Sequence, residues 1–240
     1  MSETERRNRA EPAGSRRKGR RTIGGRDASG GGRAGAARRL PARLAKAMAR
    51  RDAILDAALE EFAARGFAAT RLDDVAKRAG VAKGTIYLHF TDKEDLFQEL
   101  IRVKMGPLVG TLETAFIADL PLRAILDHAV AVMIREVFGT PRQQVIRLII
   151  SEGPRFPALA EFYYREVLTR IIAAVRKLLR RGFERGELKS EALVRFPQLL
   201  GAPLVVGLIW TQLFDRFEPL AVDAMMRAYL DVLFPGRERP

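Results

Sequence analysis

Several side chains between Thr70 and Lys93 have the chemistry needed to bind nucleic acid. They supply hydroxyl, ammonium, phenol and imidazole groups, which hydrogen-bond to phosphates and to the edges of bases. The residues that carry these groups are Thr70, Lys83, Thr85, Tyr87, His89 and Lys93, and the candidate site also includes Gly84 and Leu88, which lie among them. Taken singly, each would suit a solvated surface or a helix cap equally well. Their joint placement on one short segment favours contact with DNA.

The side chains needed for catalysis or metal binding are scarce. The chain has no cysteine and only two histidines, His89 and His128. This composition excludes disulfides, thiolate metal sites and cysteine nucleophiles, and it leaves too few histidines for most metal sites or catalytic triads. The sequence also lacks GxSxG and HExxH motifs and a glycine-rich phosphate loop. We therefore expect no enzyme activity, no metal and no cofactor.

Helices are predicted on both sides of Gly66. Apolar residues recur at helical spacing from Leu44 to Phe62, and Gly66 suits the left-handed residue that ends such a helix. Thr70 is expected to cap the next helix through its hydroxyl, with Asp73 completing a capping box.

A second short helix follows almost at once. Ala79-Gly80-Val81 predicts a turn, and Lys83–Phe90 predicts a helix whose residues Ile86 and Phe90 face inward. Two short helices joined by a glycine-containing turn form a helix-turn-helix, which presents the second helix to the major groove.

The segment around this turn closely resembles the DNA-binding domain of the TetR family of repressors. The resemblance covers about residues 48–105 and rests on Ile54-Leu55, Ala57-Ala58, Phe62, Gly66-Phe67, Thr70, Val75-Ala76, Ala79-Gly80-Val81, Lys83-Gly84-Thr85-Ile86-Tyr87, His89-Phe90, Lys93-Glu94 and Leu96-Phe97. It implies an all-α homodimer in which an N-terminal three-helix DNA-binding domain precedes a larger helical ligand-binding and dimerisation domain. It further implies a repressor that leaves a palindromic operator when a small molecule binds.

The resemblance also implies a role for each candidate residue. Lys83 and Thr85 are expected to contact base edges, and Gly84 would allow the backbone to approach DNA closely. The expected phosphate contacts are Thr70, Tyr87, His89 and Lys93.

Two positions depart from the family pattern. Ala82 stands where a serine is common, so a hydroxyl cap worth about 1 kcal/mol is absent. Leu88 replaces a residue that is usually polar or aromatic. Its side chain could meet a thymine methyl group or fold back onto the protein.

The net charge of the chain belongs to its N-terminus. Residues 1–50 hold 15 basic and four acidic residues, which is +11 of the formal +13. Residues 1–41 are rich in Arg, Gly, Ala and Ser, a composition that predicts a disordered basic tail. The tail is either a solvated extension or an arm that attracts phosphates. It has no apolar run typical of a secretory signal, so we expect a cytoplasmic protein.

Residues 106–240 are predicted to form the helical effector-binding and dimerisation domain, after the DNA-binding domain at 42–105. Breaks are expected at Gly106-Pro107, Leu120-Pro121, Gly139-Thr140-Pro141 and Gly153-Pro154. The segment 199–210 is apolar but too short to span a membrane. Small residues such as Gly207 would let a partner helix approach this segment. Together with the last helix, 221–234, it is the expected dimer interface.

A small hydrophobic or amphipathic effector is expected to bind among these helices. Candidate lining residues are Phe116, His128, Met133, Phe162, Tyr163 and Trp210, although such side chains are more often core. A shorter resemblance near residues 148–163 points to the TetR subgroup that represses multidrug efflux genes.

Three other functions remain as alternatives at this point. They are an enzyme, a helical ligand-binding protein without DNA readout, and an architectural nucleic-acid-binding protein driven by the basic tail. Footprinting with and without residues 1–41 would separate the last from a repressor, because an architectural binder loses most of its affinity with the tail.

Overall fold

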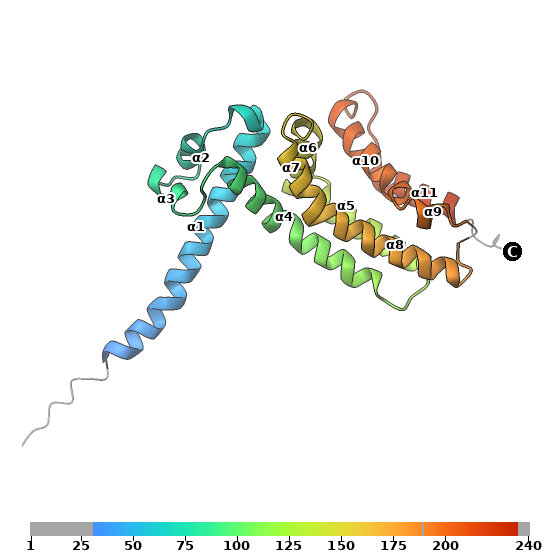
Figure 1. Cartoon of the computed structure of the whole chain (residues 1–240), viewed down its shortest axis with the longest axis horizontal. Coiled ribbons are helices and arrows are strands. Elements are labelled where there is room, and N and C mark those ends of the chain that lie inside the picture. The colour runs from blue at the N-terminus through green and yellow to red at the C-terminus, as the bar shows by residue number, and fades with distance from the viewer. Residues whose placement is uncertain (1–30, 189, 235–240) are drawn as a thin grey trace, which may run out of the picture. The chain divides into compact units, whose positions relative to one another are not determined.

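The computed structural model describes residues 31–188 and 190–234, with side chains from residue 44 onward, and every described element is a helix. The all-α prediction is confirmed. The helices are α1 (Gly31–Ala69), α2 (Leu72–Arg78), α3 (Lys83–Tyr87), α4 (Lys93–Phe116), α5 (Leu122–Val137), α6 (Pro141–Glu152), α7 (Pro157–Tyr163), α8 (Thr169–Glu184), α9 (Ala192–Arg195), α10 (Gln198–Leu213) and α11 (Val222–Leu233), with a π-helical turn (Tyr164–Leu168) joining α7 to α8 (Figure 1).

The predicted basic tail falls partly outside this description. Residues 1–30 are not described, whereas α1 begins at Gly31, so residues 31–41 are helical. Residues 31–41 contain three alanines, three arginines and one leucine, which are among the strongest helix formers, beside three glycines and one proline. The stretch also continues an existing helix, so it needs no new nucleus.

Three phenylalanine rings form the core that joins α1 to α4. Phe62 and Phe67 are completely buried, and Phe97 is 1% exposed. The Phe62 and Phe67 ring centroids lie 5.4 Å apart, and Phe97 meets both rings edge-on at 5.4 and 5.7 Å. This aromatic cluster fixes the end of α1 against the start of α4.

Two glycines shape the turns on either side of α2. Gly66 (φ 75°) interrupts the helical geometry of α1, and Gly80 (φ 66°) follows the end of α2. At the second turn the Gly80 N–H bonds to the Lys77 carbonyl and the Val81 N–H to the Ala76 carbonyl. That pair of bonds is the Schellman motif, which needs a left-handed residue at the position of Gly80.

The predicted capping role of Thr70 is wrong. Its hydroxyl donates to the carbonyls of Gly66 (2.8 Å) and Glu61 (3.2 Å), and Arg71 occupies the N-cap position of α2. The interrupted end of α1 leaves carbonyls close to Thr70, and these acceptors take the hydroxyl that was expected to serve α2.

The break predicted at Gly106-Pro107 is also wrong. Helix α4 continues through Pro107, so the predicted domain boundary at 105/106 falls inside one helix. An interior proline costs about 3 kcal/mol. Met105, Leu108 and Val109 are buried beside it, and burial of each such side chain contributes about 1.5–3 kcal/mol. Tertiary packing therefore outweighs the local penalty.

Arg142 connects α6 to α4 and, through Lys104, to α1. Its Nε donates to the Lys104 carbonyl of α4 at 2.7 Å, and its Nη1 lies 2.9 Å from the Glu136 carboxylate. The Lys104 ammonium in turn pairs with Asp56 of α1 at 2.5 Å. Polar contacts thus run from α6 through α4 to α1.

Helix α11 packs against both α10 and α5 (Figure 1). Gly207 is buried at the α10–α11 contact, where an added Cβ would lie 2.8 Å from a methyl group of Val222. The expectation that Gly207 receives a partner chain is therefore wrong, because α11 of the same chain occupies that space. Among the described residues, no helix has the length and apolar character needed to cross a membrane.

We predict opposite effects of two glycine-to-alanine changes. Gly207→Ala should lower the free energy of unfolding by about 1–3 kcal/mol, because the stiff side chain of Val222 cannot yield easily. Gly110→Ala in α4 meets nothing within 4 Å and should raise it by about 0.5–1 kcal/mol. Urea unfolding followed by circular dichroism measures both. Equal effects would contradict the packing at Gly207.

Candidate nucleic-acid interface and ligand pocket

Helix α3 ends at Tyr87, before the predicted end at Phe90, and the segment Lys83–Phe90 is anchored by one residue inside the helix and one just after it. Ile86 is completely buried and Phe90 is 3% exposed, as the sequence predicted. Lys83, Gly84, Tyr87, Leu88 and His89 are exposed, and Thr85 is half-buried. Six of the eight predicted contact residues therefore share one short exposed segment.

The Leu88 side chain does not fold back onto the protein. It is 83% exposed, whereas Tyr87 is 51% exposed. Gly84 is also open, since an added Cβ would meet nothing within 4 Å. The N-terminal part of α3 thus offers a surface that another molecule can approach closely.

Lys83 does not extend freely into solvent. Its ammonium lies 2.8 Å from the Asp73 carboxylate of α2 and 6.0 Å from the centre of the Tyr87 ring. The hydrogen bond to Asp73 raises the pKa of Lys83, so the ammonium remains charged. This pair connects the two helices of the helix-turn-helix on their exposed side.

A group of ion pairs holds α2 against α1. The Glu61 side chain is 4% exposed and accepts a hydrogen bond from Arg78 at 2.7 Å. Arg65 lies 3.2 Å from Glu61 and 3.1 Å from Asp74. The hydrogen bond to Glu61, followed by that from Arg78 to Glu60, raises the pKa of Arg78. These ion pairs were not predicted from the sequence. The local indication was an acidic residue, Glu61, directly before the core residue Phe62.

Thr70 and Lys93 occupy different surroundings from the other six residues. Thr70 is 2% exposed, with its hydroxyl bonded inside the turn. The Lys93 ammonium donates to the carbonyls of Phe67 (3.0 Å) and Ala68 (2.9 Å) and lies 4.7 Å from the centre of the Phe67 ring. Both side chains hold the end of α1 in place, which competes with direct contact to a phosphate.

The six candidate effector residues do not surround one space. Phe116, Phe162 and Tyr163 are buried, Met133 and Trp210 are half-buried, and His128 is exposed. Burial raises the pKa of Tyr163 well above its usual value. The Trp210 indole N–H donates to the Glu218 carbonyl at 2.8 Å, which ties this side chain to the loop after α10.

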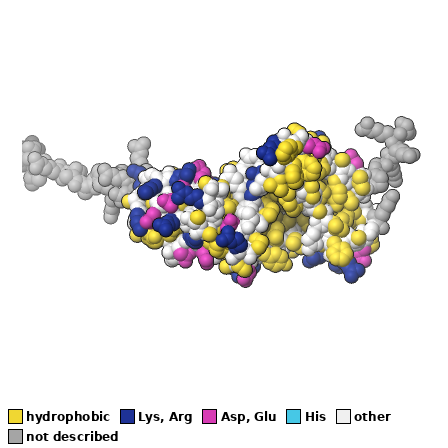
Figure 2. Space-filling model, turned by 90° about the horizontal axis from the view of Figure 1, so that it is seen from above, with side chains coloured by type: hydrophobic (Ala, Val, Ile, Leu, Met, Phe, Trp, Pro, Cys, Tyr) yellow, Lys and Arg dark blue, Asp and Glu magenta, His cyan; other side chains and the backbone are white. Residues whose placement is uncertain are grey.

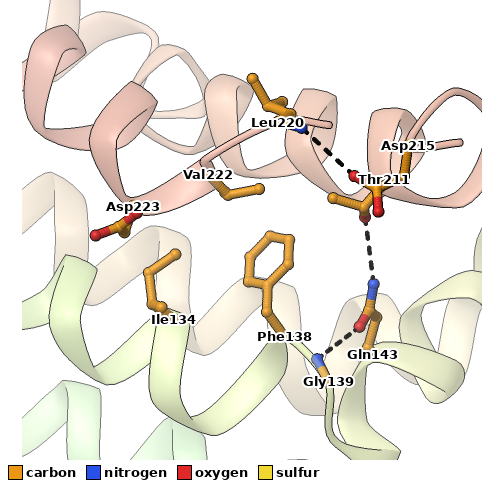
Figure 3. A pocket seen from close by; sticks show the side chains of 9 residues that line it. All are labelled: Ile134, Phe138, Gly139, Gln143, Thr211, Asp215, Leu220, Val222 and Asp223. Atoms are coloured by element: carbon orange, nitrogen blue, oxygen red, sulfur yellow. Dashed lines mark hydrogen bonds between the residues drawn. The ribbon is translucent and has the colours of Figure 1, made fainter. Parts of the chain in front are cut away.

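A hollow of about 330 Å³ lies between α5, α6 and the α10–α11 segment (Figure 3). Its lining residues are Ile134, Phe138, Gly139, Gln143, Thr211, Asp215, Leu220, Val222 and Asp223. We call it the α5–α10 hollow. A second hollow of about 480 Å³ lies beside His128, which is lined otherwise by Gly110, Thr111, Thr114 and Ala115 of α4.

The α5–α10 hollow combines an apolar wall with buried polar groups. In Figure 3 the Phe138 ring points toward Val222 across the space. Gln143 is 8% exposed; its Oε1 accepts from the Gly139 N–H at 2.8 Å, and its amide nitrogen lies 3.5 Å from the Thr211 hydroxyl. None of these residues was predicted from the sequence to line a pocket, because they come from separate segments of the chain and no local pattern marks them.

Charged and apolar side chains occupy different parts of the surface. Figure 2 shows Lys, Arg, Asp and Glu interspersed over the part that carries α2 and α3, and hydrophobic side chains gathered over the C-terminal helices. The exposed apolar residues of α10 are Leu199, Val205, Val206, Ile209 and Leu213. We call this surface the outer α10 face.

Comparison with known proteins identifies both halves of the chain. Residues 54–100 match the model of bacterial regulatory proteins of the tetR family, and residues 119–232 match that of the tetracyclin repressor-like C-terminal domain. The fatty acid metabolism regulator protein of Bacillus subtilis is 30% identical over 76% of this chain and 93% of its own length.

Other relatives and a solved structure agree. The repressor BepR of Brucella suis is 36% identical over 61% of this chain and 72% of its own length. The fatty acid degradation regulator FadR of Bacillus halodurans has a similar fold, with a TM-score of 0.63 and 24% identity, over 80% of this chain and 97% of that structure. With its helix-turn-helix, its larger C-terminal helical domain and these matches, the chain belongs to the TetR family of DNA-binding transcriptional regulators.

Proposed function

We propose that this protein is a dimeric repressor that reads a palindromic operator with α3 and is released by a small hydrophobic or amphipathic effector. The observation that supports this most is the segment Lys83–Phe90, where Ile86 and Phe90 are buried and five neighbouring residues remain exposed. A recognition helix of this kind enters the major groove with its N-terminal residues against the bases.

The proposed contacts follow from the position of each residue along α3. Lys83 and Thr85 lie in the first turn and contact base edges, and Tyr87 and His89 contact phosphates at the other end. Leu88, which is 83% exposed, meets a thymine methyl group. Thr70 and Lys93 act on DNA through the turn that they hold in place.

Alanine substitutions in α3 should relax operator preference. Lys83→Ala or Thr85→Ala should cost about 1–3 kcal/mol on the operator and change preference at one or two positions of each half-site. Lys177→Ala removes an exposed ammonium from α8 and should change nothing, which makes it the matched control. Competition binding against duplexes with single base changes measures the effect. Unchanged preference in both α3 variants would show that α3 is not the reading element.

The outer α10 face is the proposed dimer interface. Val205 and Val206 are 46% and 50% exposed, and Ile209 and Leu213 continue the same face. Apolar surface of this extent on a helix is stabilised by burial against a second copy, which a two-fold axis brings into contact with itself. Two copies of α10 and α11 would then form a four-helix bundle.

Val206→Asp should separate the dimer and reduce operator binding at least tenfold. The buried carboxylate would lack a partner, and one half-site alone supplies too few contacts. Ile117→Asp is the control, since Ile117 is 68% exposed at the end of α4 and lies outside the proposed interface. Sedimentation equilibrium gives the mass of each variant. A dimeric Val206→Asp protein would contradict this interface.

The α5–α10 hollow is the proposed effector site. Gln143 and Thr211 provide hydrogen bonds, while Ile134, Phe138 and Val222 provide apolar surface. Among solved relatives, SmeT is in complex with triclosan and the FadR of Bacillus subtilis with stearoyl-CoA, which supports a hydrophobic or amphipathic ligand.

The single tryptophan makes this site measurable. Trp210 directly precedes the lining residue Thr211, so a bound hydrophobic dye such as N-phenyl-1-naphthylamine should quench its fluorescence. Phe138→Ala should weaken dye binding about fivefold, equivalent to about 1 kcal/mol of lost contact. Phe183→Ala, at an exposed phenylalanine of α8, should leave it unchanged. Equal affinity of both variants would place the dye elsewhere.

A further inference from the structure

Lys83, the first residue of α3, forms an ion pair with a carboxylate of its own chain. Lys83 is the one charged side chain in the sequence of α3, Lys-Gly-Thr-Ile-Tyr, and its ammonium lies 2.8 Å from Asp73. The two side chains are 63% and 47% exposed. An ion pair this exposed contributes little to the free energy of folding. It does restrict which further partners the Lys83 ammonium can bind.

We propose that Asp73 is a specificity-determining residue that holds Lys83 for base edges and disfavours its use on phosphates. This inference rests on the proposed placement of α3 in the major groove. A lysine ammonium has three donors, so it can keep Asp73 as one partner and donate to a neutral base acceptor with another. A phosphate brought to the same ammonium meets the negative charge of Asp73, and the like charges repel.

The effect differs between the two modes of DNA binding. Nonspecific binding is supplied almost entirely by phosphate contacts, whereas operator binding adds contacts to bases. A carboxylate beside Lys83 therefore penalises random DNA more than the operator. Selectivity obtained by weakening contact with the wrong partner is a general device in recognition.

The neighbouring residue Asp74 provides a matched control. It lies in the same first turn of α2 and carries the same charge, but its carboxylate pairs with Arg65 of α1 at 3.1 Å. Asp73→Asn and Asp74→Asn therefore change the net charge equally. Only the first releases Lys83.

The experiment compares two duplexes of equal length, one selected from a random pool by the parent protein and one of unselected random sequence. Asp73→Asn should tighten binding to random DNA about tenfold, lower the ratio of specific to nonspecific affinity several-fold, and steepen the salt dependence of nonspecific binding by about one unit as Lys83 gains a phosphate. Asp74→Asn should leave the ratio unchanged, and Asp73→Glu should restore it.

A Lys83→Ala background separates this inference from the proposed function. There, Asp73→Asn should no longer alter the ratio, because the residue it restrains is missing. If Lys83→Ala relaxes operator preference while Asp73→Asn behaves like Asp74→Asn, the role of Asp73 is overturned and α3 remains the reading helix. If Lys83→Ala leaves preference intact, the proposed base contact of Lys83 fails and the role of Asp73 fails with it, whereas reading by α3 fails only if Thr85→Ala also leaves preference intact. Circular dichroism establishes that each variant is folded.

Discussion

Helices α2 and α3 contain seven and five residues, so neither can persist without tertiary support. The helices on either side of them, α1 and α4, are joined at Phe67, which lies in the aromatic cluster at the end of α1. Lys93 lies over its ring and bonds to its carbonyl, and Phe156, just before α7, meets the ring edge-on at 4.9 Å. Packing around this one side chain therefore fixes the end of α1, from which the chain continues into α2 and α3.

In the DNA-binding domain, acidic side chains form ion pairs with individual basic side chains. Residues 51–104 hold nine basic and ten acidic side chains, so bulk attraction to DNA cannot come from this segment. Glu61 and Asp74 fix the arginines that hold α2, while Asp73 faces Lys83. The formal charge of the chain is therefore concentrated in residues 1–50, whereas the helix-turn-helix is nearly neutral.

Helix α10 carries apolar side chains on two faces, and these faces have different surroundings. One face contacts α11 through Gly207 and contributes Thr211 to the α5–α10 hollow. The other is the outer α10 face, which remains exposed in a single chain. Under the proposed function, a ligand in the hollow would lie directly behind the dimer interface. Helix α6 lines the hollow through Gln143, and its Arg142 donates a hydrogen bond to the Lys104 carbonyl of α4.

The sequence by itself determined the helices around the turn and the residues that anchor α3, because periodicity and a left-handed glycine act within a few neighbouring residues. It misassigned Thr70 and Pro107. The Thr70 hydroxyl bonds back to carbonyls of α1 that the interruption at Gly66 leaves within reach, and Pro107 stays helical because α4 is packed on both sides of it. The α5–α10 hollow and the pairing of Lys83 with Asp73 were also decided only by tertiary structure. Each joins residues from separate helices, and no local pattern specifies which distant side chain packing brings within reach.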